Sequence, residues 1–258
     1  MATGPQFGDL QSRLDDLARR LKERVIQYEA TRDSRAVFTF AYLTITEALA
    51  DALPTSGFNS PAWVVLLAEH FASLYMHALR TSETSPNDLP PAWHEVFQTI
   101  ELKRTSVLED LILSMTAHII HDLPLALVEV GLSGPDGYSC IGDFHKMNDV
   151  LATNVQTIAD AVSDRYEPAF RWLDQFEKRH TEILTNYGFR LSRGMAWYNA
   201  NRLLDPKSMQ DANGSINRSV VVLVEDVRKP PVWSARIILR GFRFLAGLLR
   251  RWPKERPA

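Results

Sequence analysis

Hydrophobic residues recur every three or four positions along most of the chain, which is the spacing of an α-helix with one buried face. Leu10, Leu14, Leu17, Leu21 and Val25 show this spacing directly after Asp9, a residue suited to cap a helix. The same pattern predicts further helices at residues 36–53, 61–80, 93–130 with a break near Lys103, 141–162, 167–187, 189–204 and 233–252. The valine-rich stretch 219–227 fits either a short strand or a buried helical turn. The pattern therefore predicts an all-α fold.

Composition and length fit a globular protein with a sizeable core. The chain has 258 residues, of which 45% are hydrophobic and 23% charged. We expect one bundle-like helical domain at residues 1–228 and a separable amphipathic helix at 229–258. The single cysteine, Cys140, excludes a disulfide framework and is typical of a reducing compartment. Without a secretory signal or an apolar run of about 20 residues, the sequence predicts a cytoplasmic protein.

Charge is distributed unevenly between the two parts. Residues 228–256 contain nine Lys or Arg and one acid, whereas the rest of the chain has 20 basic and 30 acidic residues. The net charge of −2 argues against a nucleic-acid partner. The basic amphipathic helix at 233–252 fits either a membrane surface or the acidic body of the protein. The short Pro230-Pro231 link favours docking on the body.

Two predicted helices are apolar on most sides and carry narrow polar stripes. On the helix that begins at Pro61, the stripe consists of Glu69, His70, Ser73 and His77, spaced three or four residues apart. Such helices belong in the centre of a domain. A buried charge is costly unless it is paired, so we expect this stripe to face another polar stripe or a cavity.

The second stripe lies on the segment 107–130 and is made of five residues at helical spacing. Pro124 follows it, and because proline cannot donate a backbone hydrogen bond, we expect a kink there that frees a carbonyl near the histidines. The alternative is that one helix ends at Leu123 and another begins. The members of the stripe are Asp110, Ser114, His118, His121 and Asp122.

Together the stripes predict a polar pocket inside the bundle. Histidines and acids on two central helices favour a functional site over a structural network, since perturbed ionisable groups gather at sites. Asp143 either caps its helix or faces the pocket. The predicted lining is Glu69, His70, Tyr75, His77, His118, His121, Asp122, Asn148, Arg193 and Trp197, with Arg193 and Trp197 as a closing cation and aromatic wall.

Four stretches resemble an uncharacterised family of helical proteins, a domain of unknown function. The most specific is SMTAHIIHDLPLAL (114–127). The others are LAEHFASLYMHAL (67–79), DFHKMNDVL (143–151) and RGMAWYNANRL (193–203), in the family's order. The chain has Glu69 where the family pattern more often has Asp. The resemblance implies an all-helical fold and points to Glu69, His118, His121, Asp122, Asp143, Asn148, Arg193 and Trp197.

One hypothesis is a metal-dependent enzyme of hydrolase or oxygenase type acting on a small organic molecule. His118 and Asp122, four residues apart on a helix, are able to bind one ion, with Glu69 and Asp143 completing the ligand set. This oxygen-rich ligation suits Fe, Mn, Mg or Zn. His121 would then either support the metal ligands from behind or act as general base.

A second hypothesis is a metal-free cyclase or isomerase of secondary metabolism. Here His118, His121 and Asp122 do acid–base work in an apolar pocket. A third hypothesis is a non-enzymatic helical protein that binds a partner or a membrane surface through 233–252. The sequence leaves the substrate and the oligomeric state open.

Overall fold

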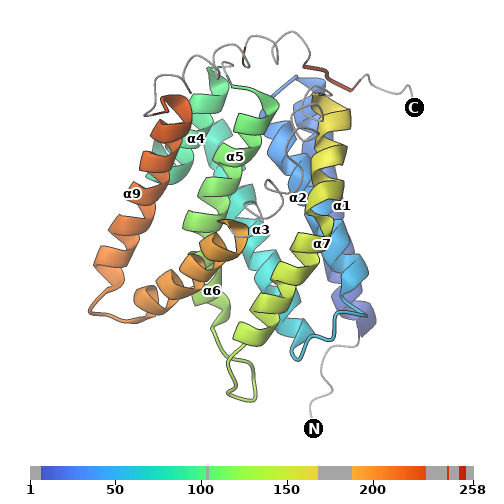
Figure 1. Ribbon diagram of the computed structural model, residues 1–258, viewed down its shortest axis with the longest axis vertical. Helices are drawn as coiled ribbons and strands as arrows, with labels where there is room; N and C mark the ends of the chain where they lie inside the picture. The colour runs from blue at the N-terminus through green and yellow to red at the C-terminus, as the bar shows by residue number, and fades with distance from the viewer. Residues whose placement is uncertain (1–6, 103–104, 168–187, 231–242, 244–249, 254–258) are drawn as a thin grey trace.

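The computed structural model describes residues 7–102, 105–167, 188–230, 243 and 250–253. Within these ranges the regular structure is helical and contains no β-strand, so the prediction of a single all-α domain is confirmed. A helix without a label in Figure 1 covers residues 188–204. The labelled helices are α1 (Phe7–Ala30), α2 (Arg35–Ala52), α3 (Pro61–Thr84), α4 (Pro91–Glu101), α5 (Val107–Ala117), α6 (Leu123–Val130), α7 (Ile141–Tyr166) and α9 (Met209–Arg228), with short helical turns η1 (Pro86–Asp88) and η2 (His118–Asp122).

The helices pack side by side as an elongated bundle. α1 lies along α2, α2 packs on α7, and α9 lies against α4 and α5 on the other side (Figure 1). α3 packs against η2 and α6, which continue α5 in one helical run. The two apolar helices expected at the centre therefore do lie next to each other.

Local sequence explains where these elements begin and end. Pro61 occupies the first turn of α3, where its missing N–H costs nothing. α5 begins with a capping box, in which Ser106 accepts from the Glu109 N–H and Glu109 accepts from the Ser106 N–H. α6 ends at Gly131, whose φ of 79° suits glycine.

Some predicted elements differ from the structure. The ambiguous stretch 219–227 is helical and belongs to α9, because Ile216, Val220 and Val224 form one buried face at helical spacing. The first half of α9 was not predicted. The predicted helix at 167–187 lies outside the described residues, as does most of the helix at 233–252.

Two of the described arginines of the basic C-terminal segment, Arg243 and Arg250, pair with acids of α5. Arg243 donates to Glu109 (2.6 Å) and Arg250 donates to Asp110 (2.8 Å). The indole of Trp252 packs edge-on against Tyr166. These contacts are those expected of a basic tail meeting the acidic body.

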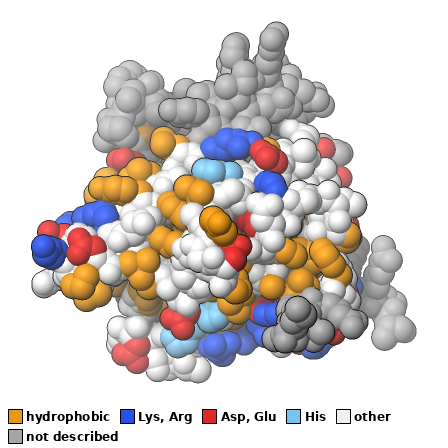
Figure 2. All heavy atoms as spheres, turned by 90° about the horizontal axis from the view of Figure 1, so that it is seen from below, with side chains coloured by type: hydrophobic (Ala, Val, Ile, Leu, Met, Phe, Trp, Pro, Cys, Tyr) orange, Lys and Arg blue, Asp and Glu red, His pale blue; other side chains and the backbone are white. Residues whose placement is uncertain are grey.

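Buried side chains form two main hydrophobic clusters. One lies between α2, α4, α5 and the C-terminal half of α3, and the other between the N-terminal half of α3, α6, α7 and residues 188–204. Phe71 and Met115 pack against both. On the face shown in Figure 2, apolar side chains are interspersed with charged ones.

Two helical runs are long and apolar enough to cross a membrane by length and composition alone, Pro61–Thr84 and Val107–Val130. More than half of each is buried inside the protein. The core helices of a globular domain have the same properties, so this is weak evidence for a membrane location.

Candidate acid–base site

Three residues of the predicted pocket meet on the turn η2. His118 Nδ1 lies 2.9 Å from one carboxylate oxygen of Asp122, and His121 Nδ1 lies 2.8 Å from the other. His118 and Asp122 are 3% and 1% exposed. A carboxylate can only accept hydrogen bonds, so each imidazole donates its Nδ1–H. The turn thus holds a buried carboxylate between two imidazoles.

The turn η2 is π-helical, and Pro124 explains why the helix widens there. The Leu123 N–H donates to the His118 carbonyl, five residues back, and the proline ring next in sequence lacks an N–H altogether. The expected departure from regular helix geometry near Pro124 is therefore a π-turn within a continuous run. Such turns are rare and are found frequently at functional sites.

Trp93 is a fourth member of the site that sequence reasoning missed. Its indole N–H donates to both oxygens of Asp122, at 3.0 and 3.1 Å. Trp93 belongs to α4, and nothing in its local spacing distinguishes it from an ordinary core tryptophan. Only the packing of α4 on the π-turn reveals this contact.

The protonation states follow from burial and these hydrogen bonds. Burial alone would raise the pKa of Asp122, but the hydrogen bonds from His118 and His121 outweigh it and hold that pKa below its usual value. Burial lowers the pKa of His118, against the opposing effect of Asp122. At neutral pH Asp122 is therefore a carboxylate and His118 a neutral imidazole.

The other ring nitrogen of His118 is buried and has no hydrogen-bond partner among the described residues. Because Nδ1 carries the proton, Nε2 carries a lone pair. Phe71 stacks on the imidazole, with ring centroids 3.6 Å apart and planes at 5°. The rings that surround His118 are Phe38, Tyr42, Phe71, Tyr75 and Trp93.

Tyr75 contributes an apolar ring to this surrounding. Its hydroxyl lies 2.7 Å from the Thr39 hydroxyl, so its polar end is already hydrogen-bonded. Burial raises the pKa of the Tyr75 phenol above its ordinary value, so the phenol stays protonated at neutral pH. Tyr75 therefore shapes the site rather than supplying a charge.

A second buried polar cluster involves three of the predicted residues. Arg193 donates from Nε to Asn148, and its guanidinium lies 4.3 Å above the Phe144 ring. Trp197 packs against Phe144, with centroids 5.1 Å apart, and against Trp63. The Arg193 guanidinium thus lies over Phe144, and the same ring also contacts Trp197.

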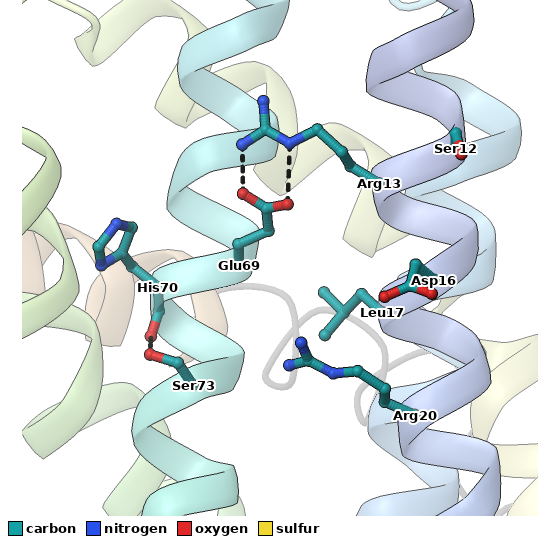
Figure 3. Close-up of a pocket in the computed structure, with 8 residues that line it drawn as sticks. All are labelled: Ser12, Arg13, Asp16, Leu17, Arg20, Glu69, His70 and Ser73. Atoms are coloured by element: carbon teal, nitrogen blue, oxygen red, sulfur yellow. Dashed lines mark hydrogen bonds and ion pairs between the residues drawn. The ribbon is translucent and has the colours of Figure 1, made fainter.

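The polar stripe on α3 does not face inward, which corrects the expectation from its sequence. Glu69 pairs with Arg13 of α1, and both side chains are about one-third exposed (Figure 3). His70 is half-buried and lines the same groove, of about 500 Å³, whereas His77 is exposed and lies near Thr81. These side chains are wholly or partly exposed, so they avoid the cost of burial.

Asp143 is buried and holds the loop that leads into α3. Its carboxylate accepts from the backbone N–H groups of Asn59 (2.8 Å) and Ser60 (2.6 Å), just before α3 begins. It therefore binds this loop and makes no capping hydrogen bond to its own helix. An aspartate in the first turn of a helix gives no sequence signal for such a long-range partner.

The donor set does not fit the predicted metal centre. Glu69 and Asp143 have other partners, and both oxygens of Asp122 already accept from the rings of His118, His121 and Trp93. Across the described ranges, no group of three or more His, Cys, Asp or Glu is arranged to hold an ion. An ion bridging His118 and Asp122 would have to displace these hydrogen bonds.

Fold and site define an all-helical protein with a buried His–Asp cluster on a π-turn. A family model matches residues 14–230, and the chain belongs to this family, described as a family of unknown function (DUF5995). The resemblance to a helical domain of unknown function is thus confirmed. Comparisons with curated proteins and with solved structures found no match.

Proposed function

We propose that the protein is a metal-free acid–base enzyme that moves a proton on a small organic molecule. The observation that carries this proposal is the unpartnered, buried Nε2 of His118, whose opposite nitrogen is fixed by Asp122. This is the arrangement of a general base, since the carboxylate selects the tautomer and then stabilises the imidazolium. An isomerase or cyclase uses such a group.

The aromatic rings around His118 favour its role as a catalytic base over a role in a purely structural hydrogen-bond network. A structural network is stable when all its buried polar atoms are paired, because an unpaired acceptor costs about 1–3 kcal/mol. His118 Nε2 carries this cost among five aromatic rings. Burial also keeps the imidazole neutral, and therefore able to accept a proton, at neutral pH.

Access to the base depends on Phe71. This ring covers one face of the imidazole, and it is itself only partly buried. A rotamer change at Phe71 would uncover His118 without breaking a hydrogen bond. The substrate that fits this interior is a molecule with an apolar body and an acidic C–H next to a carbonyl.

A first experiment tests the assigned tautomer directly. Protein labelled with ¹⁵N at histidine is examined by NMR at neutral pH, with His118→Gln used to assign the signal. We expect a neutral His118 with the proton on Nδ1 and a lone pair on Nε2. A proton on Nε2, or a charged ring, would overturn the assignment of His118 as the base.

A second experiment measures proton transfer itself. Small ketones and oxo acids are incubated with the protein in D₂O, and loss of the C–H signal next to the carbonyl is followed by NMR. We expect exchange that falls by about 10²-fold or more in His118→Gln. His145→Gln, which changes an exposed histidine, is the matched control. Exchange that is absent, or equal in both variants, would overturn the proposal.

A further inference from the structure

Arg193 is a buried cation for which the described residues supply no anion. It is 3% exposed, and its terminal nitrogen Nη2 has no hydrogen-bond partner in the described part of the chain. Burial lowers its pKa to about 9, and no carboxylate contributes to that value. A charged group removed from water needs a counter-ion or a full set of hydrogen bonds, and Arg193 has neither.

Other arginines of this protein show what is missing. Arg35 pairs with Asp33, Arg165 with Glu29, and Arg250 with Asp110. All three are less deeply buried than Arg193. Arg193, the most buried of these arginines, is therefore the one that no described carboxylate pairs with, although burial makes its unpaired charge the most costly.

The guanidinium is nevertheless held in a fixed position. Its Nε–H donates to Asn148, and its plane is supported by the Phe144 ring, both from α7. A guanidinium fixed through Nε keeps its terminal nitrogens available for a planar anion. This is how a binding site for an anion is organised before the ligand arrives.

Tyr42 of α2 connects this cation with the base. Its ring centroid lies 4.7 Å from that of His118. Burial raises the pKa of the Tyr42 hydroxyl, the Asp122 carboxylate raises it further, and Arg193 lowers it. The Tyr42 hydroxyl therefore interacts electrostatically with both Asp122 and Arg193.

We propose that Arg193 binds a carboxylate group of the ligand. This inference rests on the proposed function in placing that ligand beside His118, and it names the substrate class as small, largely apolar carboxylic acids. A single guanidinium with an amide partner and aromatic neighbours matches a planar monoanion. A phosphate, with more charge and more oxygens, needs several cations.

Binding is tested with matched probes on the full chain. Acetate, butyrate and benzoate are compared with their uncharged amides by calorimetry and by the shift in melting temperature. We expect at least one carboxylate to bind with a Kd of about 1 mM or tighter, and its amide to bind at least about tenfold more weakly.

Two variants locate the site. Arg193→Gln removes the charge, so carboxylate binding should fall by at least about tenfold. Asn148→Asp supplies the missing anion inside the protein, so it should raise the melting temperature by about 2–4 °C and abolish carboxylate binding. Arg190→Gln, which removes an exposed arginine of the same helix, should leave binding unchanged.

The outcomes separate this inference from the proposed function. Equal binding of acid and amide, undiminished binding in Arg193→Gln, or no carboxylate binding at about 10 mM would overturn the role of Arg193. Carboxylate binding that depends on Arg193, without C–H exchange, would overturn only the acid–base proposal. Exchange on ketones with no preference for a carboxylate would overturn only the present inference.

Discussion

Two aspartates of the same helical run are buried almost completely, yet they have different kinds of partner and their pKa values shift in opposite directions. Asp110, in the first turn of α5, accepts from Thr105 and pairs with Arg250 of the C-terminal segment. Asp122, on the π-turn, accepts from no described group other than aromatic ring N–H groups. Burial raises the pKa of Asp110 to about 6, whereas hydrogen bonds from two histidines lower the pKa of Asp122.

The difference lies in what each carboxylate does for its partner. Asp110 holds a distant part of the chain in place through a cation. Asp122 fixes the tautomer of His118 and leaves one nitrogen of that ring unpaired. The first arrangement uses a buried charge for tertiary structure, and under the proposed function the second would use it to prepare a base.

The largest effect is expected from Asp122→Asn. The amide presents a donor where two imidazoles and an indole also donate, so we expect a loss of about 3 kcal/mol or more in unfolding free energy. Proton exchange should fall by about 10³-fold, because the His118 tautomer is no longer fixed. Denaturant titration and exchange in D₂O measure both quantities.

The matched control is His118→Gln, which removes the base but keeps a group able to donate to Asp122. Its unfolding free energy should change by about 1 kcal/mol or less. If His118→Gln destabilised as strongly as Asp122→Asn, the cluster would be a structural network.

Asp110→Asn should act on the tail and leave the base intact. Removing this carboxylate leaves Arg250 without its acid partner but also removes a costly buried charge, so the unfolding free energy should change by about 1 kcal/mol or less. In the double variant with Arg250→Met the loss should be smaller than the sum of the single losses, since the pair is broken once. Additive losses would show that the two side chains do not interact.

The two aspartate sites should also give opposite responses to acid. In the unfolded chain, His118 takes up a proton below about pH 6.5. In the native state burial lowers the pKa of His118, so the ring stays neutral to lower pH. The contribution of His118 to the unfolding free energy therefore decreases as pH falls. Because its pKa is raised in the native state, Asp110 takes up a proton at a higher pH in the native state than in the unfolded chain. Its contribution to the unfolding free energy therefore increases as pH falls through about 6.

Denaturant titrations between pH 7 and 5 separate these contributions. His118→Gln should make stability less sensitive to acid, and Asp110→Asn should make it more sensitive. Each change in slope is at most about 1.4 kcal/mol per pH unit, the value for one proton. Identical slopes in all three proteins would contradict both assignments.

The smallest effect is expected from removal of metal ions. Because both oxygens of Asp122 already accept hydrogen bonds, EDTA should shift the melting temperature by less than about 1 °C. Elemental analysis of the purified protein, His118→Ala and Asp122→Ala should give the same low metal content. A near-stoichiometric metal that is lost in both variants would restore the metal-dependent hypothesis.

Hydrophobic spacing was sufficient to predict most of the described helices, because a helix needs only local periodicity and suitable ends. The start of α3 at Pro61 and the buried faces of α1 and α7 follow from such local signals. The departure near Pro124 was also predictable, since it results from the missing proline N–H. So was the pairing of His118 with Asp122 across one turn.

Contacts between helices were not predictable in the same way. The stripe on α3 looked like half of a pocket, but the rotation of α3 in the bundle turns Glu69 towards Arg13. Asp143 binds the backbone of Asn59 and Ser60, more than eighty residues earlier in the chain and just before α3. No sequence signal indicated that Trp93 would donate to Asp122.

The sequence by itself thus determined the all-α fold, the two central helices and the His118–Asp122 pair, because these depend on neighbours within one or two turns. Only the tertiary structure decided that Asp122 is saturated by ring N–H groups, that His118 Nε2 is unpaired, and that Arg193 lacks an anion. The physical reason is that burial and hydrogen-bond satisfaction depend on how helices are rotated and docked. A helical period does not specify that docking.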